Sequence, residues 1–260
     1  MDVNTNPSQR LAGRVAIVTG AGQGVGEGIA MKLAAEGASV VIAARRSATG
    51  EPVAQAIRDF GGVAECIVTD VTTRASIEEC VALTVAHHGG LDVMVHNAFA
   101  GGVASRLEET PPDAWFQMSY TSAWAGFWCA QAAFPHLDAS DAGRLILVTS
   151  PSGVEGSANI PLYSPAKAAQ RAMAKSLARE WGPHRITVNC IAPVAETPAL
   201  AGAFAQVPTL RGAIEARTPL GRIGDPVSDI GGVAAFLAGP DAGYVSGQTI
   251  VCDGGSFLGL

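Results

Sequence analysis

Residues 20–28 of the chain read GAGQGVGEG, with a glycine at every second position. Two well-known phosphate-binding motifs do not fit this run. The dinucleotide fingerprint G-x-G-x-x-G fails because its third glycine would fall on Val25, Glu27 or Ile29. The phosphate loop G-x-x-x-x-G-K-[ST] fails because the run contains no Gly-Lys pair. The run is therefore either a flexible linker or a different turn that holds phosphate.

The glycine run lies between an apolar stretch and a helical one. Residues 15–19 form a short apolar run that is typical of a strand buried on both faces, and residues 26–36 are predicted to form a helix. At such a junction, bare backbone lets a pyrophosphate approach closely. The helix N-terminus adds free N–H groups and the positive end of its dipole. This context favours a phosphate-binding turn over an ordinary surface turn.

Short apolar runs alternate with longer helical patterns along the rest of the chain. Strands are predicted over 15–19, 39–43, 64–68, 91–95, 144–149, 187–191 and 249–251, and helices over 26–36, 53–60, 76–87, 113–135, 161–181 and 226–237. This alternation predicts an α/β fold with a single Rossmann-type, doubly wound parallel sheet of about seven strands and helices on both faces. No linker divides it, so we expect one domain over 1–260, with 199–218 as an inserted lid over the substrate.

The composition limits the class of protein. The chain has 260 residues, of which 48% are hydrophobic, enough for a large core. The net charge of −6 and the lack of a basic tract argue against nucleic acid or an anionic membrane as a partner. Five cysteines without a C-x-x-C pair argue against a disulfide framework, and no metal site is expected. A polar N-terminus and the lack of a long apolar run favour a soluble, cytoplasmic protein.

Further motifs carry a resemblance to a known family. They are T-G-x-x-x-G-x-G at 19–26, Asp70-Val71, His96-Asn97-Ala98, Ser150, Tyr163-x-x-x-Lys167, Asn189, Pro193 and Asp253-Gly-Gly. From about Leu11 onward the chain resembles the short-chain dehydrogenase/reductase family, and in particular its 3-oxoacyl thioester reductases. The resemblance implies an oxidoreductase that transfers hydride between a nicotinamide dinucleotide and a small-molecule ketone or secondary alcohol.

Three of these residues are expected to carry the chemistry. Tyr163 and Lys167 lie four residues apart on a predicted helix, so they share one face. A nearby ammonium lowers the pKa of a phenol, which would make Tyr163 a general acid and base. Ser150 ends a predicted strand, at the sheet edge where ligands bind, and its hydroxyl can bond a carbonyl oxygen that gains charge. By resemblance, Lys167 also binds the nicotinamide ribose.

The predicted cofactor site is larger than the glycine turn. It comprises Gly20, Gln23, Gly24, Val25, Gly26, Arg45, Arg46, Asp70, Val71, Asn97, Ala98, Tyr163, Lys167, Pro193 and Thr197. At the end of the second predicted strand, NAD-binding members of the family typically carry an aspartate, whereas this chain has Ala44 followed by Arg45. A guanidinium there can hold a 2′-phosphate. We therefore favour NADP(H) as the cofactor, with NAD(H) as the alternative.

Three positions depart from the family pattern. Phe99 stands where relatives have a glycine, so its ring is expected to narrow the nicotinamide site or to join the substrate wall. Ser122 takes the place of an asparagine that completes the catalytic set in many relatives, and it cannot reproduce the paired donor and acceptor of an amide. Val194 replaces a glycine and disfavours positive φ, which predicts another path for that loop.

These departures keep three functions open. The first is the NADP(H)-dependent reductase, with a 3-oxoacyl type of substrate. The second is an NAD-dependent dehydrogenase of an alcohol or a steroid. The third is a catalytically weak sensor that binds a dinucleotide.

Two further expectations concern aromatic residues. His96 is expected to be a packed residue bonded to a neighbouring backbone group rather than a titrating one. Trp115, Trp124, Phe127 and Trp128 are expected to form core or a subunit contact. The resemblance to tetrameric relatives implies a homotetramer or a homodimer.

Overall fold

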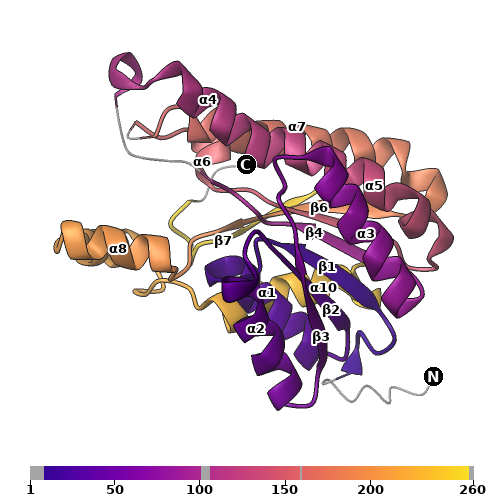
Figure 1. Cartoon of the computed structure of the whole chain (residues 1–260). Helices are drawn as coiled ribbons and strands as arrows, with labels where there is room; N and C mark the ends of the chain where they lie inside the picture. Colours follow the sequence, from indigo (N-terminus) through magenta and orange to yellow (C-terminus); the bar gives the residue numbers. More distant parts are fainter. Residues whose placement is uncertain (1–8, 101–105, 159, 258–260) are drawn as a thin grey trace.

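A seven-stranded parallel sheet forms the centre of the computed structural model (Figure 1). The structure describes residues 9–100, 106–158 and 160–257, so most of the polar N-terminus lies outside it. The strands are β1 (Val15–Thr19), β2 (Ser39–Ala44), β3 (Val63–Val68), β4 (Val93–His96), β5 (Arg144–Val148), β6 (Thr187–Pro193) and β7 (Thr249–Cys252). The prediction of a doubly wound α/β sheet of about seven strands is confirmed.

The order of the strands reverses next to β1. The sheet runs β3-β2-β1-β4-β5-β6-β7, so the chain leaves β3 at one edge and returns to the middle at β4. Thr19 at the end of β1 lies in register with His96 at the end of β4. Because open α/β sheets bind ligands where the strand order reverses, at the carboxyl ends of the strands, this fold places the glycine turn at that edge.

Helices cover both faces of the sheet (Figure 1). They include α1 (Gly24–Ala35), α2 (Ser47–Asp59) and α10 (Gly232–Ala238) on one face, and α3 (Arg74–His88), α5 (Ala125–Ala139) and α7 (Tyr163–Glu180) on the other. Ile17 and Val18 are neighbours in β1 but belong to two different apolar cores, one on each face. The strands are therefore buried on both sides, which explains why they show no polar alternation.

Several elements differ from their predicted form. The predicted helix 113–135 consists of α4 (Pro112–Ser119), a π-helical segment η3 (Tyr120–Trp124) and α5. The predicted helix 226–237 likewise begins as a π-helical segment η5 (Pro226–Gly231) before α10. A π-helical segment adds a residue to a turn without changing the apolar pattern around it, so periodicity alone could not reveal either one.

The predicted insertion 199–218 folds as two short helices. These are α8 (Pro198–Gln206) and α9 (Leu210–Arg217), and α8 extends from the side of the molecule (Figure 1). Neither helix contains a buried residue. The part of this segment that faces the protein therefore packs loosely, as expected for a segment that covers a ligand.

Three of the four aromatic residues singled out in the sequence do not form core, whereas Trp128 packs against the core on the α5 face of the sheet. Trp115, Trp124 and Phe127 are 41%, 50% and 40% exposed, so the core interpretation is wrong for these three. Tyr120 stacks on Trp124, which extends the aromatic surface. The alternative expectation, a subunit contact, stays a prediction.

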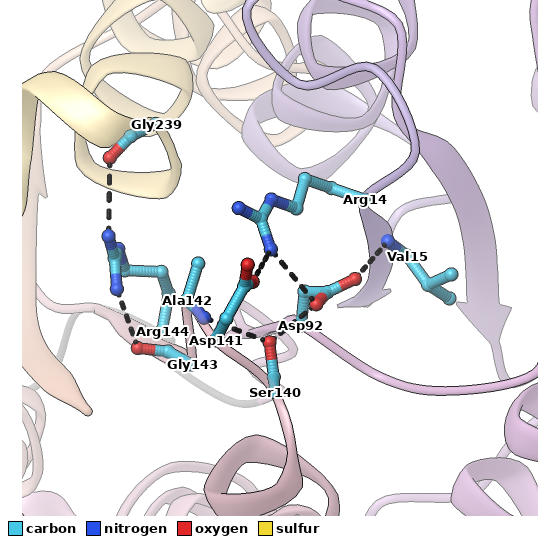
Figure 2. A network of polar contacts seen from close by, with 9 residues as sticks. All are labelled: Arg14, Val15, Asp92, Ser140, Asp141, Ala142, Gly143, Arg144 and Gly239. Atoms are coloured by element: carbon cyan, nitrogen blue, oxygen red, sulfur yellow. Dashed lines mark hydrogen bonds and ion pairs between the residues drawn. The ribbon is translucent and has the colours of Figure 1, made fainter. Parts of the chain in front are cut away.

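A cluster of partly buried and exposed polar residues lies at the amino ends of the strands (Figure 2). The carboxylate of Asp92 accepts hydrogen bonds from the backbone N–H of Val15 (2.8 Å), from Ser140 Oγ (2.5 Å) and from Arg14 Nη1 (3.4 Å). It thus joins the start of β1, the start of β4 and the loop before β5. Arg144 lies beside this cluster and donates to the carbonyl of Gly143. The amino edge is fixed by these contacts, which leaves the carboxyl edge for ligands.

The close packing of α1 against η5 depends on Gly28, and we expect Gly28→Ala to destabilise the protein. A Cβ at Gly28 would lie 2.3 Å from both the carbonyl carbon and the oxygen of Pro226, which are backbone atoms and cannot turn away. We expect the free energy of unfolding in urea to fall by ~1–3 kcal/mol. Gly232→Ala is the matched control, because nothing lies within 4 Å of its added methyl group. Equal effects of the two substitutions would contradict this explanation.

Candidate active site

A cavity of about 810 Å³ opens at the carboxyl ends of the strands. Its lining includes every predicted cofactor residue: Gly20, Gln23, Gly24, Val25, Gly26, Arg45, Arg46, Asp70, Val71, Asn97, Ala98, Tyr163, Lys167, Pro193 and Thr197. Ser150 also lines it. Ser122 is the predicted site residue that does not, because it is fully buried behind the cavity. The fold therefore brings together residues from across the chain, with that one exception.

The glycine turn holds bare backbone against the end of β4. Gly20 and Gly24 have φ values of +66° and +61°, which side chains rarely adopt. A Cβ at Gly26 would lie 2.4 Å from Asn97 Nδ2 and 2.5 Å from the carbonyl oxygen of Gly20. Asn97 Nδ2 in turn donates to the carbonyls of Thr19 (3.0 Å) and Gly20 (3.2 Å). These contacts require glycine and fix the turn.

The turn fits the pyrophosphate of a dinucleotide. Helix α1 begins at Gly24, and the side chain of Gln23 before it makes no capping hydrogen bond. The first N–H groups of α1 therefore stay available for an anion at a site where the helix dipole also favours negative charge. The residues present fit a nicotinamide dinucleotide, with Gly20, Gly24 and Gly26 at its phosphates.

The end of β2 is cationic. Arg45 and Arg46 are exposed and line the cavity directly after Ala44. Helix α2 begins at Ser47, and no side chain caps its N-terminus. Two guanidinium groups and an open helix N-terminus thus lie where the strand would otherwise present a carboxylate.

Asp70 lines the same cavity and also forms a turn. Its carboxylate accepts hydrogen bonds from the hydroxyl (2.7 Å) and the backbone N–H (2.9 Å) of Thr72. These two hydrogen bonds, with a smaller contribution from Arg45, lower the pKa of Asp70. Asp70 thus forms a turn after β3 and lines the cavity, and its role in a cofactor site stays a prediction.

Tyr163 and Ser150 meet at the sheet edge, at the start of α7 and directly after β5. Burial raises the pKa of Tyr163, and the hydrogen bond with the Ser150 hydroxyl opposes that shift. The sequence predicts that the Lys167 ammonium lowers this pKa. That expectation is wrong for this structure, because burial of the phenol outweighs the interactions that stabilise its anion.

Lys167 is almost completely buried one helical turn beyond Tyr163. Its Nζ donates to the carbonyl oxygen of Val148 at 2.8 Å. Burial lowers the pKa of Lys167 to about 7, because a charged ammonium loses its hydration there. The carbonyl dipole stabilises the charge only in part, so this group is held in an environment that disfavours its protonated form.

Phe99 covers both of these groups. Its ring meets that of Tyr163 edge to face, with centroids 5.0 Å apart and an interplanar angle of 78°. The Nζ of Lys167 lies 4.9 Å from the centroid of the Phe99 ring and 5.8 Å from that of Tyr163. Phe99 therefore lines the cavity beside Tyr163 and makes a cation–π contact with Lys167, while its role at a nicotinamide site stays a prediction.

His96 is a packed residue, as predicted. It is fully buried, and its Nε2 donates to the carbonyl oxygen of Ser122 at 3.1 Å. Because Nε2 carries the hydrogen, Nδ1 accepts from the hydroxyl of Thr19 at 3.1 Å. Burial, with a smaller contribution from the charge of Lys167, lowers the pKa of His96 to about 3. The imidazole is therefore neutral at physiological pH and acts as a fixed link between β1 and η3.

Ser122 connects η3 to α7 instead of entering the cavity. Its hydroxyl donates to the carbonyl of Ala166 at 3.3 Å, and its own carbonyl also accepts from Gln170 Nε2 at 3.3 Å. Gln170 does not appear among the residues predicted from the sequence, and Thr19 appears there only as the first residue of the glycine motif. Gln170 lies seven residues after Tyr163 on α7, and this spacing places it on the same helix face.

The third departure from the family pattern causes no backbone strain. Among the described residues other than glycine, only Arg185 has a positive φ, so Val194 does not need one. The backbone N–H of Val194 donates to Cys252 at 2.9 Å, and its carbonyl accepts from Gly224 at 3.2 Å. The expected change of path is therefore accommodated within ordinary backbone hydrogen bonding.

The segment after β6 leads over the cavity. Thr197 Oγ1 accepts from the backbone N–H of Leu200 and so caps α8. Leu200, Ala203 and Leu210 line the cavity, and a lid over 199–218 stays a prediction. Within the part of the chain that the structure describes, no helix has the length and apolar character needed to cross a bilayer.

Comparisons with known proteins agree over almost the whole chain. A family model described as enoyl-(acyl carrier protein) reductase matches residues 20–256. A hydroxynaphthalene reductase-like protein of Metarhizium brunneum is 36% identical over 261 residues, which cover 95% of this chain and 96% of that protein. The cis-4-hydroxycyclohexanecarboxylate dehydrogenase of Sinomonas cyclohexanicum is 36% identical over 248 residues, or 95% and 98% of the two chains.

Solved structures show the same architecture. A dehydrogenase/reductase from Sinorhizobium meliloti 1021 superposes with a TM-score of 0.86 at 34% identity, over 95% of this chain and 96% of that one.

Tropinone reductase-like 3 of Erythroxylum coca is a further relative by sequence. It is 32% identical over 248 residues, and the match covers 95% of both chains.

Because the ammonium of Lys167 is buried, we expect Lys167→Met to stabilise the fold. The pKa of Lys167 falls from its usual 10.5 to about 7 on folding, so the wild type loses stability as the pH falls from 10.5 towards 7. We expect the variant to gain ~1–3 kcal/mol in the free energy of unfolding at pH 7, after the lost hydrogen bond to Val148 is subtracted. The gain is expected to shrink as the pH rises towards 10.5.

Urea unfolding at pH 7 and pH 9.5 measures this difference. Lys175→Met is the matched control, because Lys175 lies on the same helix but is exposed, and its replacement is expected to change stability by less than ~0.5 kcal/mol. A Lys167→Met protein that is less stable than wild type at both pH values would contradict the expected cost of burying this charge.

Proposed function

The chain belongs to the short-chain dehydrogenase/reductase family of oxidoreductases, and on that premise we propose that it reduces a ketone to a secondary alcohol with NADP(H). Members of the family use a nicotinamide dinucleotide and act on alcohols or ketones. The observation that supports this proposal most strongly is that Ser150, Tyr163 and Lys167 line the same cavity as the glycine turn, at the point where the strand order reverses.

Tyr163 is proposed to supply the proton. When bound, the nicotinamide supplies the hydride to the carbonyl carbon. The Tyr163 hydroxyl protonates the carbonyl oxygen, and the Ser150 hydroxyl holds that oxygen by a hydrogen bond as it gains charge. Because burial raises the pKa of Tyr163, the phenol keeps its proton at neutral pH, and this favours the direction of reduction.

Lys167 is proposed to assist the proton transfer from Tyr163. Its Nζ lies 5.8 Å from the centroid of the Tyr163 ring, and both residues line the cavity. A positive charge there stabilises the phenolate that remains after proton transfer. The buried Lys167 therefore contributes more to the reaction than to the stability of the fold.

The preference for NADP(H) rests on the end of β2. Arg45 and Arg46 and the uncapped N-terminus of α2 offer charge-assisted hydrogen bonds to a 2′-phosphate, and Ala44 offers no carboxylate to a ribose hydroxyl. The alternative cofactor, NAD(H), is favoured by the attraction between the Asp70 carboxylate and the Arg45 guanidinium, because this attraction competes with a 2′-phosphate for the guanidinium.

We propose a neutral, ring-shaped ketone as the substrate. The described cations that line the cavity are Arg45, Arg46 and Lys167, and all three are assigned here to the dinucleotide or to Tyr163, which leaves no further cation for a substrate carboxylate. Apolar side chains line that end instead, namely Phe99, Ile160, Leu200, Ala203 and Leu210. The relatives named after hydroxynaphthalene and tropinone also support a ring substrate.

A 3-oxoacyl thioester is the substrate expected from the sequence resemblance, and the description of the matching family model supports it. Rates of NADPH oxidation with 2-tetralone, cyclohexanone and a 3-oxoacyl thioester distinguish the two classes. We expect a higher kcat/KM with the ring ketones. A preference for the thioester would overturn the substrate assignment and leave the cofactor assignment in place.

The homo-oligomer expected from the sequence is part of this proposal. The exposed aromatic surface of Trp115, Trp124 and Phe127 supports a contact with a second copy of the chain, because monomers rarely leave several large aromatic groups in water together.

A catalytically weak, dinucleotide-binding protein is the second candidate. It is favoured by the position of Ser122 outside the cavity and by the ring of Phe99 over Lys167. The two candidates share the cofactor site and differ in whether Tyr163 transfers a proton.

We expect Tyr163→Phe to lower kcat for ketone reduction by roughly 10²–10⁴-fold, because the variant keeps the ring but loses the proton donor. The dissociation constant of NADPH, measured by fluorescence titration, is expected to change by less than about threefold. Tyr120→Phe is the matched control, since Tyr120 loses the same atom and its side chain is exposed at the start of η3. Equal, slow turnover by the wild type and Tyr163→Phe would support the second candidate instead.

Replacing Arg45 and Arg46 together by alanine is expected to weaken NADPH selectively. The loss of charge-assisted bonds of ~1.5–3 kcal/mol corresponds to roughly a 10- to 100-fold rise in the NADPH dissociation constant, with little change for NADH. Isothermal titration with both dinucleotides measures this. Arg74→Ala, at an exposed arginine that pairs with Glu78, is the control. A parallel loss of affinity for both dinucleotides would show that the arginines do not read the 2′-phosphate.

A further inference from the structure

The ammonium of Lys167 has hydrogen-bonding capacity that the protein does not use. An ammonium has three N–H donors, and within the described chain Nζ donates one hydrogen bond, to Val148. No ion pair with a carboxylate joins Lys167 among the described residues. Lys167 nevertheless lines the cavity, so its remaining donors are available to an oxygen atom of a ligand.

The ring of Phe99 lies over Nζ, on a side where such an oxygen could otherwise bond. An oxygen bonded to Nζ lies about 2.9 Å from it. Placed between Nζ and the ring, whose centroid is 4.9 Å from Nζ, that oxygen would approach the ring centre to about 2 Å. This is well inside the ~3.5 Å contact distance of non-bonded atoms. The ring and the oxygen therefore exclude each other.

Phe99 can move without disturbing the sheet. It follows β4 in a stretch without regular secondary structure, and its side chain is only partly buried. The next residue, Ala100, is fixed through both its N–H (3.1 Å) and its carbonyl (3.0 Å) by the hydroxyl of Thr121. With the backbone held there, a change of side-chain rotamer is the motion that frees Lys167.

We propose that Phe99 competes with the sugar on the nicotinamide side of the dinucleotide for Lys167, and that binding of the dinucleotide must displace the ring. This inference rests on the proposed function, because it takes a nicotinamide dinucleotide as the ligand. Phe99 thereby sets the affinity for the cofactor. In the free protein, the cation–π contact with Phe99 partly stabilises the buried charge of Lys167. The dinucleotide binds less tightly because this contact must be broken.

The test compares a whole dinucleotide with one of its halves. Isothermal titration measures the binding of NADPH and of 2′,5′-ADP, which carries the adenosine and its phosphates but no nicotinamide ribose. Phe99→Ala is expected to bind NADPH roughly 2- to 30-fold more tightly than wild type, the range set by a cation–π contact of ~0.5–2 kcal/mol. Its affinity for 2′,5′-ADP is expected to change by less than about twofold.

A second variant separates the effect of the aromatic ring from a general loss of folding in Phe99→Ala. Phe99→Leu keeps most of the apolar volume but has no aromatic face, and we expect its NADPH affinity to lie between those of the wild type and Phe99→Ala. Weaker or unchanged NADPH binding in both variants would overturn the proposal. An equal change for NADPH and 2′,5′-ADP would also overturn it, since the effect would then not depend on the nicotinamide half. If the wild type bound neither NADPH nor NADH, the proposed function itself would fail.

The chemical reactivity of the Lys167 amine tests its shielding by Phe99 directly. Acetylation by a small neutral reagent at pH 7.5, followed by mass spectrometry of peptides, gives the rate at Lys167 relative to the exposed Lys175 of the same helix. Phe99→Ala is expected to raise this ratio several-fold, and NADPH is expected to suppress it. An unchanged ratio would mean that the ring does not shield the ammonium and would overturn the proposal.

Discussion

The burial of one ammonium group is the constraint on which the site depends. Lys167 lies on α7 behind the carboxyl edge of the sheet, with the carbonyl of Val148 on one side and the Phe99 ring on another. A carboxylate partner would neutralise this charge and leave nothing for a substrate or cofactor. The fold instead stabilises it with dipoles and a ring, which cost little to rearrange, so the charge stays available for chemistry.

The helix that carries Tyr163 and Lys167 is held in place from behind. A π-helical segment exposes the carbonyl of Ser122, and two side chains donate to it: His96 from the end of β4 and Gln170 from α7. Because His96 also accepts from Thr19, these contacts link β1, β4, η3 and α7 through buried hydrogen bonds. The glycine turn and the catalytic helix thus share a single support, and a neutral imidazole is the group that joins them.

Two of the three departures from the family pattern, at Ser122 and Phe99, change the surroundings of Lys167. Ser122 removes an amide from the site and becomes a structural link, while Phe99 adds a ring where relatives have bare backbone. Both changes alter the surroundings of Lys167 rather than the turn that binds phosphate. Arg45 and Arg46 line the same cavity from the end of β2, a different element from α7, which carries Tyr163 and Lys167.

The sequence alone determined the order of strands and helices, the glycine turn and the residues that line the cavity, because these follow from local patterns of apolar residues and from short motifs. It did not reveal the direction of the pKa shift of Tyr163, the π-helical segments or the role of Ser122. Those depend on burial and on contacts such as the one between Phe99 and Lys167, 68 residues apart in the chain. Electrostatics in a protein interior depends on which atoms exclude water from a charge, and only the tertiary structure decides that.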